Sequence, residues 1–286
     1  MQTKQLLKQG WARALLFVIC FTLLVILTTV LANWLTGAKQ PVNTSKTLQN
    51  NMPGKDLLVY LSISLLISIL TVLGFRKLVD KQSVTSLGLE IKNNVSHAAV
   101  GFFMATLLLG TGSLILIISN NLQWTDIVFD STQLFIGLVS MFLVAFSEEL
   151  VFRGYILINL MQSTNKWIAL VISALLFTFF HTNNPGITPV AIVNVFIAGT
   201  LLGINYIYTK NLWFSIFFHF GWNFYQGSIL GYRVSGVNLQ SLLEQELTGN
   251  LLLTGGPFGF EGSVLAGILS IMAAVALAWI YKKRYE

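Results

Sequence analysis

The chain of 286 residues is poor in charge, in cysteine and in proline. Charged residues make up only 10% of it, whereas 55% is hydrophobic, and a soluble domain of this size normally carries far more charge. The single cysteine, Cys20, excludes an intrachain disulfide framework and a cysteine metal cluster. These shortages argue against a soluble enzyme and against a disulfide-rich secreted domain. They favour an integral membrane protein.

Eight apolar stretches follow one another, separated by short polar connections. They are residues 14–34, 57–75, 97–119, 132–160, 167–182, 189–209, 212–230 and 262–281. The first is too long for the apolar part of a signal peptide, so we expect a retained first helix. The pattern predicts an all-α, polytopic transmembrane helix bundle of about eight helices, which forms a single integral membrane domain over residues 1–286 in the cell membrane.

The formal charge of +6 reports topology rather than a nucleic-acid partner, because the basic residues gather in alternate connections. One side carries Lys4, Lys8, Arg13, Arg76, Lys77, Lys81, Lys92, Lys166, Lys210, Lys282, Lys283 and Arg284. The other side carries Lys39, Lys46, Lys55 and Arg233. Both termini are therefore expected in the cytoplasm. Residues 37–56 and 231–261 are the two long extramembrane loops, the second with an amphipathic helix predicted around residues 239–247.

Two adjacent acids, Glu148 and Glu149, lie inside the fourth apolar stretch. An ionisable group at that depth costs several kcal/mol and indicates a functional site. Glu149 and Arg153 stand at i and i+4 and so face the same side of a helix, where they can pair. Glu148 points elsewhere and has no partner on its own helix, so other helices must supply its surroundings.

Three further polar residues, His181, His219 and Asn223, fall in other apolar stretches. His219 and Asn223 share a helix face at i and i+4. Counted at about 1.5 Å per residue from the cytoplasmic ends of their helices, these residues and Glu148 lie roughly 13 to 21 Å deep. They therefore share one layer, which predicts a common site.

Such a set can activate water. Glu148 would act as general base or acid, His181 would orient the water, and His219 with Asn223 would donate hydrogen bonds to an oxyanion. No cofactor is needed, although Glu148, His181 and His219 also fit a two-histidine, one-carboxylate zinc site. A serine mechanism lacks a Gly-x-Ser-x-Gly element. A proton-coupled transporter would also place such residues at mid-membrane, but the chain has no internal repeat.

Three short motifs carry a resemblance to a known family. They are Glu148-Glu149-Leu-Val-Phe-Arg153 (EExxxR), Phe177-Thr-Phe-Phe-His181 (FxxxH) and His219-Phe-Gly-Trp-Asn223 (HxxxN). Together they resemble the CPBP family of CAAX proteases and bacteriocin-processing enzymes, also called Abi proteins, over residues 133–226. The resemblance implies a glutamic intramembrane endopeptidase whose catalytic residues are Glu148, Glu149, Arg153, His181, His219 and Asn223.

The resemblance implies a substrate only in outline, namely a peptide or membrane protein that meets the enzyme at the lipid bilayer. CAAX-like, bacteriocin and signalling peptides all remain open. The alternative is a non-proteolytic role in bacteriocin immunity or as a scaffold, although the intact motifs argue against it. Because the acids lie slightly nearer the basic side of the bundle, the site is expected to be reached from the cytoplasmic half of the membrane.

Overall fold

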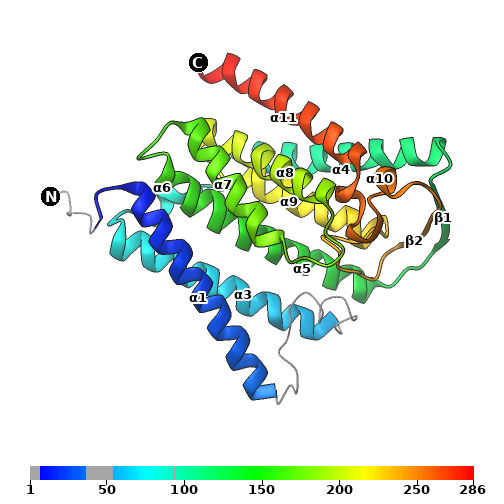
Figure 1. The fold of residues 1–286 in the computed structure, drawn as a ribbon, viewed down its shortest axis with the longest axis horizontal. Coiled ribbons are helices and arrows are strands. Elements are labelled where there is room, and N and C mark those ends of the chain that lie inside the picture. Colours follow the sequence, from blue (N-terminus) through cyan, green and yellow to red (C-terminus); the bar gives the residue numbers. More distant parts are fainter. Residues whose placement is uncertain (1–6, 37–53, 93) are drawn as a thin grey trace.

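The structure is a computed structural model that describes residues 7–36, 54–92 and 94–286, with only the backbone of residues 28–36 and 54–57. Figure 1 shows a bundle of helices with a small sheet at one end. The helices are α1 (Gly10–Thr36), α3 (Gly54–Gly74), α4 (Val95–Ile118), α5 (Ser131–Glu149), α6 (Ile158–Leu160), α7 (Lys166–His181), α8 (Pro189–Thr209), α9 (Trp213–Phe224), α10 (Leu251–Thr254) and α11 (Val264–Tyr285). The strands are β1 (Leu122–Ile127) and β2 (Leu243–Leu247).

Within the described residues, six helical segments are long and apolar enough to cross a membrane. They are Gly10–Leu27, Leu58–Val79, Val95–Ile118, Ser131–Leu160, Pro189–Thr209 and Val264–Tyr285. The other two predicted stretches form the shorter helices α7 and α9. The predicted mostly helical membrane bundle is thus confirmed. Of the loop predicted at residues 37–56, residues 37–53 lie outside the described part, and α3 begins at Gly54.

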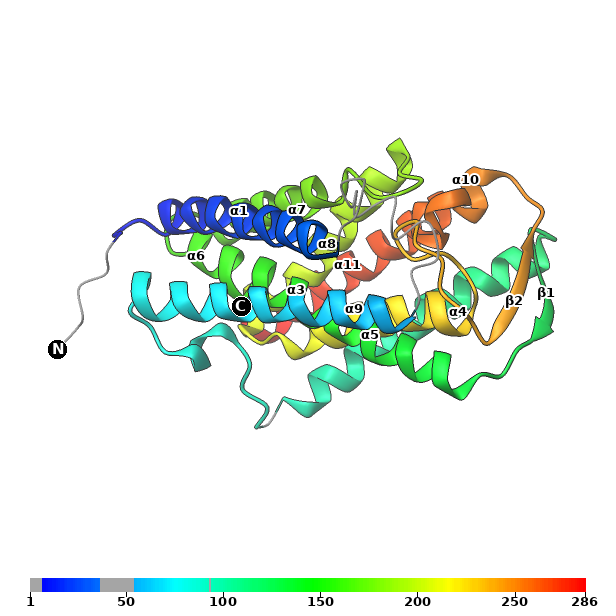
Figure 2. The same ribbon diagram turned by 90° about the horizontal axis from the view of Figure 1, so that it is seen from below.

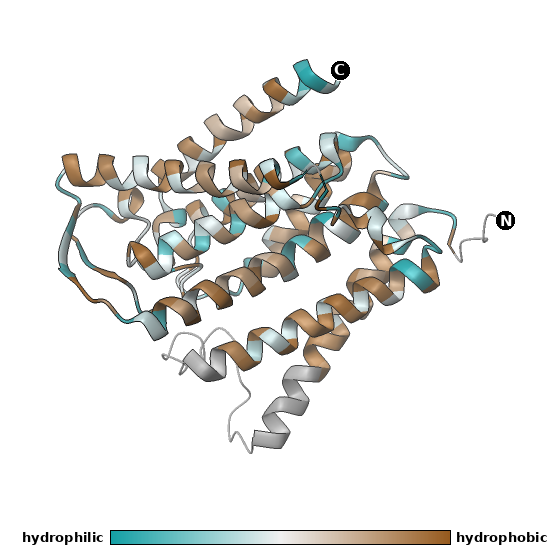
Figure 3. Cartoon of the chain, turned by 180° about the vertical axis from the view of Figure 1, so that it is seen from behind, coloured by the Kyte–Doolittle hydropathy of each residue, from teal (hydrophilic) through white to brown (hydrophobic). Residues whose placement is uncertain are grey.

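Helix α9 lies at the centre of the bundle. It packs against α4, α5 and α8, while α8 in turn packs against α7 and α11. Helices α1 and α3 form a separate pair on one flank, with α3 against α5, as the view from below shows (Figure 2). Hydrophobic residues cover most outward helix faces in Figure 3, as expected where lipid replaces water. Of the two shorter helices, α9 is enclosed by its neighbours, whereas α7 exposes an apolar face with Ile168, Leu175 and Phe179.

The regular helices give way to wider π-helical turns at Phe75–Val79, Leu150–Leu157 and Tyr225–Ile229. The second begins directly after Glu149 and the third two residues after Asn223, so both adjoin the predicted site residues. Wide turns of this kind are rare and gather at functional sites. Simple i, i+4 counting on a regular helix did not anticipate them.

The amphipathic helix predicted around residues 239–247 is wrong. Residues Leu243–Leu247 form strand β2, which pairs antiparallel with β1. The sequence Leu-Glu-Gln-Glu-Leu alternates, with Glu244 and Glu246 exposed and the intervening residues half-buried, which is the period of a strand. Leucine, glutamate and glutamine are good helix formers, so the sequence alone favoured a helix. The strand that pairs with them lies about 120 residues earlier in the chain, and nothing in the local sequence indicates it.

The connections gather at two opposite ends of the bundle. At the first, which we call the basic end, Gly10 N donates to Ser163 Oγ, Asn211 Nδ2 donates to Glu90 O, and Lys166 pairs with Glu286. At the second, the capped end, the connection after α7 meets residues 231–263, which we call the capping segment. Gly236 and Gly186 have no side chain at this contact: an added Cβ would lie 1.8 Å from Pro185 O at the first and 2.8 Å from Pro257 C at the second.

A buried charge cluster holds α1 to the basic end. Asp80 accepts from Arg76 Nη1 at 2.8 Å and from the Tyr155 hydroxyl at 2.9 Å, and Arg13 Nη1 lies 3.6 Å from its other side. Arg13 and Asp80 are completely buried. One carboxylate thus balances two guanidinium groups, and Arg13 also donates to Gln162 Oε1 at 2.5 Å. The cluster joins α1, the end of α3 and the fourth apolar segment.

Replacing Asp80 should therefore destabilise the protein strongly. Asp80→Asn would leave the two buried guanidinium groups of Arg13 and Arg76 without a counter-charge, which typically costs about 3 to 5 kcal/mol. We expect a clear fall in thermal unfolding midpoint in detergent. Glu90→Gln, an exposed acid at the same end, is the matched control and should leave the midpoint unchanged. Equal midpoints for the two variants would show that the cluster does not hold the fold.

Candidate active site

The site is built outward from Glu149, whose side chain is completely buried. Its Oε1 accepts from Arg153 Nη1 at 2.8 Å, the pairing expected from the i, i+4 spacing. The same oxygen lies 2.9 Å from Nδ1 of His219 on α9, which spacing along one helix could not reveal. Glu149 therefore joins α5 to α9 through a single carboxylate oxygen. It is a bridge between two motifs rather than a partner of Arg153 alone.

Arg153 is held on three sides. Besides Glu149, its Nη2 donates to the carbonyl oxygen of Gly199 at 3.0 Å, and its guanidinium lies 4.5 Å from the ring centre of Phe177. Gly199 admits α7 closely, since an added Cβ would meet the backbone of Ala174 at 3.2 Å. The Gly199-xxx-Gly203 spacing thus serves close helix packing. Arg153 fixes the relative positions of α7 and α8.

Phe177 explains the aromatic position of the second motif. Its ring lies 4.4 Å from the ring centre of His181 and 6.2 Å, edge-on, from that of His219. A cation on one face and an imidazole beside it suit the negative face of an aromatic ring. Phe177 therefore positions both histidines and the arginine, although it carries no reactive group.

The hydrogen-bond partners define the tautomers of both histidines. His181 Nδ1 lies 2.7 Å from the carbonyl oxygen of Phe177, which can only accept, so that nitrogen carries a proton. His219 Nδ1 faces Glu149, which accepts while it is ionised beside Arg153. Each ring therefore turns Nε2 toward the remaining acid. These nitrogens lie 3.7 Å (His181) and 3.9 Å (His219) from Oε2 of Glu148.

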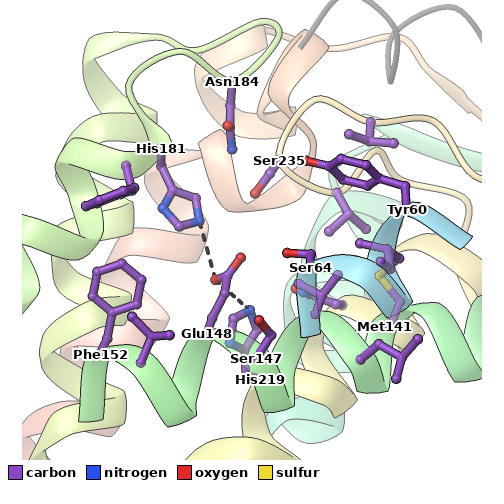
Figure 4. A pocket seen from close by; sticks show the side chains of 18 of the residues that line it. Tyr60, Ser64, Met141, Ser147, Glu148, Phe152, His181, Asn184, His219 and Ser235 are labelled. Atoms are coloured by element: carbon purple, nitrogen blue, oxygen red, sulfur yellow. Dashed lines mark ion pairs between the residues drawn. The ribbon is translucent and has the colours of Figure 1, made fainter. Parts of the chain in front are cut away.

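Glu148 projects into a cavity of about 600 Å³, as Figure 4 shows, with 29% of its side chain exposed. The residue just before it is anchored, because Ser147 Oγ is 2.7 Å from Ser68 Oγ on α3. Glu148 Oε2 is buried and has no hydrogen-bond partner among the described residues. A free carboxylate oxygen beside two imidazole nitrogens is thus held at the inner edge of an open space.

The distances at this point have a chemical consequence. A neutral His181, a neutral His219 and an ionised Glu148 would present only acceptors to one another, at separations too long for direct hydrogen bonds. A buried acceptor without a donor is costly. The three groups therefore require a donor between them, either a water molecule or a proton on one imidazole. The geometry suits both holding a water and taking its proton.

Asn223 completes the predicted set and is also buried. It lines the main cavity together with Glu148, His181 and His219, in agreement with the common layer expected from the sequence. His181, His219 and Asn223, but not Glu148, also line a second, smaller cavity of about 60 Å³. All six predicted site residues are thus close together, in an outer group around Glu148 and an inner group around Glu149.

The sequence reading missed a third acid, Glu261. It comes from the capping segment and lines the smaller cavity with His181, His219 and Asn223. Its Oε1 accepts from both the backbone nitrogen and the hydroxyl of Ser235, the hydroxyl at 2.9 Å. Burial raises the pKa of Glu261 above its ordinary value, against the opposing effect of the Ser235 hydrogen bonds. A lone acid in a glycine-rich loop gives no spacing signal.

Asn194 fixes Glu261 from α8. Its Nδ2 donates to the backbone carbonyl oxygens of Glu261 at 2.8 Å and Ser263 at 2.7 Å. Asn194 is a polar residue in an apolar helix, and anchoring the capping segment accounts for it. The capping segment is therefore a fixed roof over the site. Its residues Val234, Ser235, Val237 and Leu239 line the main cavity.

The main cavity extends toward the capped end. Besides residues of the helices, its lining includes Asn183, Asn184 and Pro185 after α7 and the capping-segment residues named above. Within the described part of the chain, no residue of the basic-end connections lines it. The connections that line the cavity are thus those of the capped end, whereas the sequence favoured an approach from the cytoplasmic, basic side. Counting depth along single helices cannot show which loops close a site.

The fold and its six apolar segments define a multi-pass membrane protein with a buried acid and histidine site. The sequence model of the family described as type II CAAX prenyl endopeptidase Rce1-like matches residues 130–225. This match confirms the resemblance of that segment to the CPBP family and supports a protease. Neither the curated proteins nor the solved structures gave a match. The capping segment and helices α1, α3, α4 and α11 lie outside the matched residues.

The stability of the protein should depend on Glu149 and Arg153 as a buried pair. Glu149→Gln and Arg153→Gln should each lower the free energy of unfolding by about 3 to 5 kcal/mol, since each leaves a buried charge without its partner. The double variant should be less harmful than the two losses added together. Thermal unfolding in detergent measures this. Glu286→Gln, which breaks the exposed pair with Lys166, is the control and should change little.

A stable Glu149→Gln protein would contradict this assignment. So would strictly additive losses, because they would mean that Glu149 and Arg153 do not depend on each other.

Glu261 should make stability depend on pH. Because its pKa is raised on folding, the folded protein binds the proton more tightly than the unfolded chain. The stability that the neutral form provides is complete below the ordinary carboxyl pKa and is lost as pH rises through the raised value. Glu261→Gln imitates the neutral acid, so wild type should match it at low pH and unfold at progressively lower temperature as pH rises.

The measurement is the thermal midpoint of both proteins across pH, with Glu244→Gln, an exposed acid of β2, as the control. A difference between wild type and Glu261→Gln that stays constant with pH would show that Glu261 does not titrate as the structure implies.

Proposed function

We propose that the protein is an intramembrane endopeptidase of the glutamic type, which hydrolyses a peptide bond at the membrane with a water activated by Glu148. The observation that carries the proposal is the unpartnered Oε2 of Glu148, which faces Nε2 of both His181 and His219 at the inner edge of an open cavity. The family match over residues 130–225 supports the same class of reaction.

In the proposed reaction, a water held by Glu148 and His181 attacks the carbonyl carbon of the peptide bond. Glu148 takes one proton of the water as the new carbon–oxygen bond forms, and the carbonyl oxygen becomes an oxyanion. The carbon–nitrogen bond then breaks, and the proton passes from Glu148 to the leaving amine. The products are a carboxylic acid and an amine, so the step needs no other reactant.

The oxyanion would be stabilised by His219 and Asn223. Because His219 Nδ1 already faces Glu149, only a protonated His219 can donate from Nε2, and Glu149 stands where it favours that positive charge. Asn223 contributes its amide as an uncharged donor. Under this proposal Glu149 is a positioning residue, which holds His219 in the donating orientation while Arg153 balances its own charge.

A zinc-dependent form of the reaction was the minority alternative from the sequence. Among the described residues no group of three histidines, cysteines or acids has the arrangement of a metal site. The proposed mechanism uses the side chains alone. Metal content of the purified protein, with cleavage assayed before and after strong chelation, tests the point directly. Stoichiometric zinc whose removal abolishes cleavage would overturn the glutamate-only chemistry.

The central test compares cells that contain wild-type protein with cells that contain Glu148→Gln. The variant should fold and accumulate normally, because Glu148 makes no buried hydrogen bond, and should lose roughly 10² to 10⁴-fold in turnover with its general base. A peptide precursor should then accumulate in the membrane peptidome of the variant only. Glu90→Gln serves as the control, since it removes an exposed acid at the basic end that does not line the cavity.

An unchanged peptidome, together with a biological effect that Glu148→Gln retains, would favour the non-proteolytic immunity or scaffold role instead. A variant that failed to accumulate would be replaced by His181→Gln, whose loss should stop turnover through the same water.

A further inference from the structure

The opening of the cavity and the distribution of charge point to the side from which the substrate comes. From Glu148, the cavity runs past Ser64 and Tyr60 of α3 and past Asn184 and Ser235, which surround its outer part in Figure 4. These residues belong to the capped end or to the half of α3 nearest to it. Among the described residues, none from the basic-end connections lines this cavity.

The packing toward the basic end is closed. Every residue of the π-helical turn Leu150–Leu157 is buried, and its Tyr155 packs against Phe17 at 4.2 Å between ring centres. Behind Tyr155 lies the charge cluster of Arg13, Arg76 and Asp80. A peptide approaching from the basic end would have to separate this core and break the buried ion pairs, which is costly.

The two ends also differ in charge. In the part of the chain that the structure describes, the capped end carries an excess of acids, and the basic end carries most of the cations. The charged residues of the capped end in that part are Lys55, Asp56, Asp126, Asp130, Arg233, Glu244, Glu246 and Glu261, while Lys39 and Lys46 lie outside the described residues. Lysine and arginine accumulate on the cytoplasmic side of membrane proteins. The basic end is therefore cytoplasmic, and the capped end with its cavity faces the outside.

We propose that the site takes its substrate from the extracytoplasmic side of the membrane, so that it acts on an exported peptide or on the outer end of a membrane-anchored peptide. This inference rests on the proposed function for the cleavage itself, but not for the side of entry. A tail that stays in the cytoplasm, as after lipid modification there, would not reach Glu148.

The cavity also indicates the chemistry of that peptide. One wall of the cavity is apolar, with Met141, Val144, Phe152 and Phe180, and it lines the same space as the polar groups of Glu148, His181 and His219. Apolar side chains next to the cleaved bond would fit this wall. The surplus of acids at the capped end attracts a peptide with basic residues and repels an acidic one. The substrate class is thus an exported peptide that is apolar at the cleavage site and neutral or basic overall.

The test uses single cysteines in a Cys20→Ser background and a small membrane-impermeant thiol reagent applied to intact or permeabilised cells. Glu246→Cys reports the capped end, Lys283→Cys the basic end and Ser64→Cys the cavity itself. All three can be repeated in Glu148→Gln. Labelling needs no proteolysis, so its result stands whether or not the proposed function holds.

We expect Glu246→Cys and Ser64→Cys to react fully in intact cells and Lys283→Cys only after permeabilisation. Labelling of Lys283→Cys from outside would invert the orientation and overturn the proposal. A second outcome would also overturn the proposal. If Glu246→Cys reacted in intact cells but Ser64→Cys reacted only after permeabilisation, or not at all, the cavity would not open to the exterior.

Discussion

A single carboxylate oxygen, Oε1 of Glu149, holds the site together. It receives both Arg153 from its own helix and His219 from the central helix α9. A completely buried carboxylate is tolerated only when charge and hydrogen bonds compensate it, and here one oxygen collects both. Because Arg153 also reaches Gly199 and Phe177, this one interaction sets the spacing of four helices. Oε1 of Glu149 is thus engaged on two sides, whereas Oε2 of Glu148 has no hydrogen-bond partner among the described residues.

The sequence predicts the helices well and their connections poorly. Long apolar stretches leave the backbone no partner but itself in lipid, so their helices could be located from composition alone. Strand β2 could not, since its five residues favour a helix by propensity and its partner strand is remote. The cluster of Arg13, Arg76 and Asp80 was hidden for a different reason. Its two arginines counted as topological charges, and nothing in their spacing showed that both are buried.

In the site, too, some contacts follow from the sequence and others do not. Residues within one helical turn, such as Glu149 with Arg153 or His219 with Asn223, follow from spacing, and their common depth indicates that the helices meet. Other features depend on how the helices rotate against each other. They are the contact of His219 with Glu149, the tautomers of the histidines and the packing of Arg153 and the histidines around Phe177. Glu261 depends on a loop. Such features need three-dimensional packing, because no period in the sequence encodes them.

The roof of the site has a consequence for the order in which the protein is made. Its residues leave the ribosome after all three motif helices, and Asn194 can grip Glu261 and Ser263 only once the chain has returned to α8. A nascent chain that ends near Gln226 would already contain Glu148 and both histidines, yet their cavity would lack a cover. The cavity is thus covered only after the capping segment, which directly precedes α11, has been made and has reached Asn194.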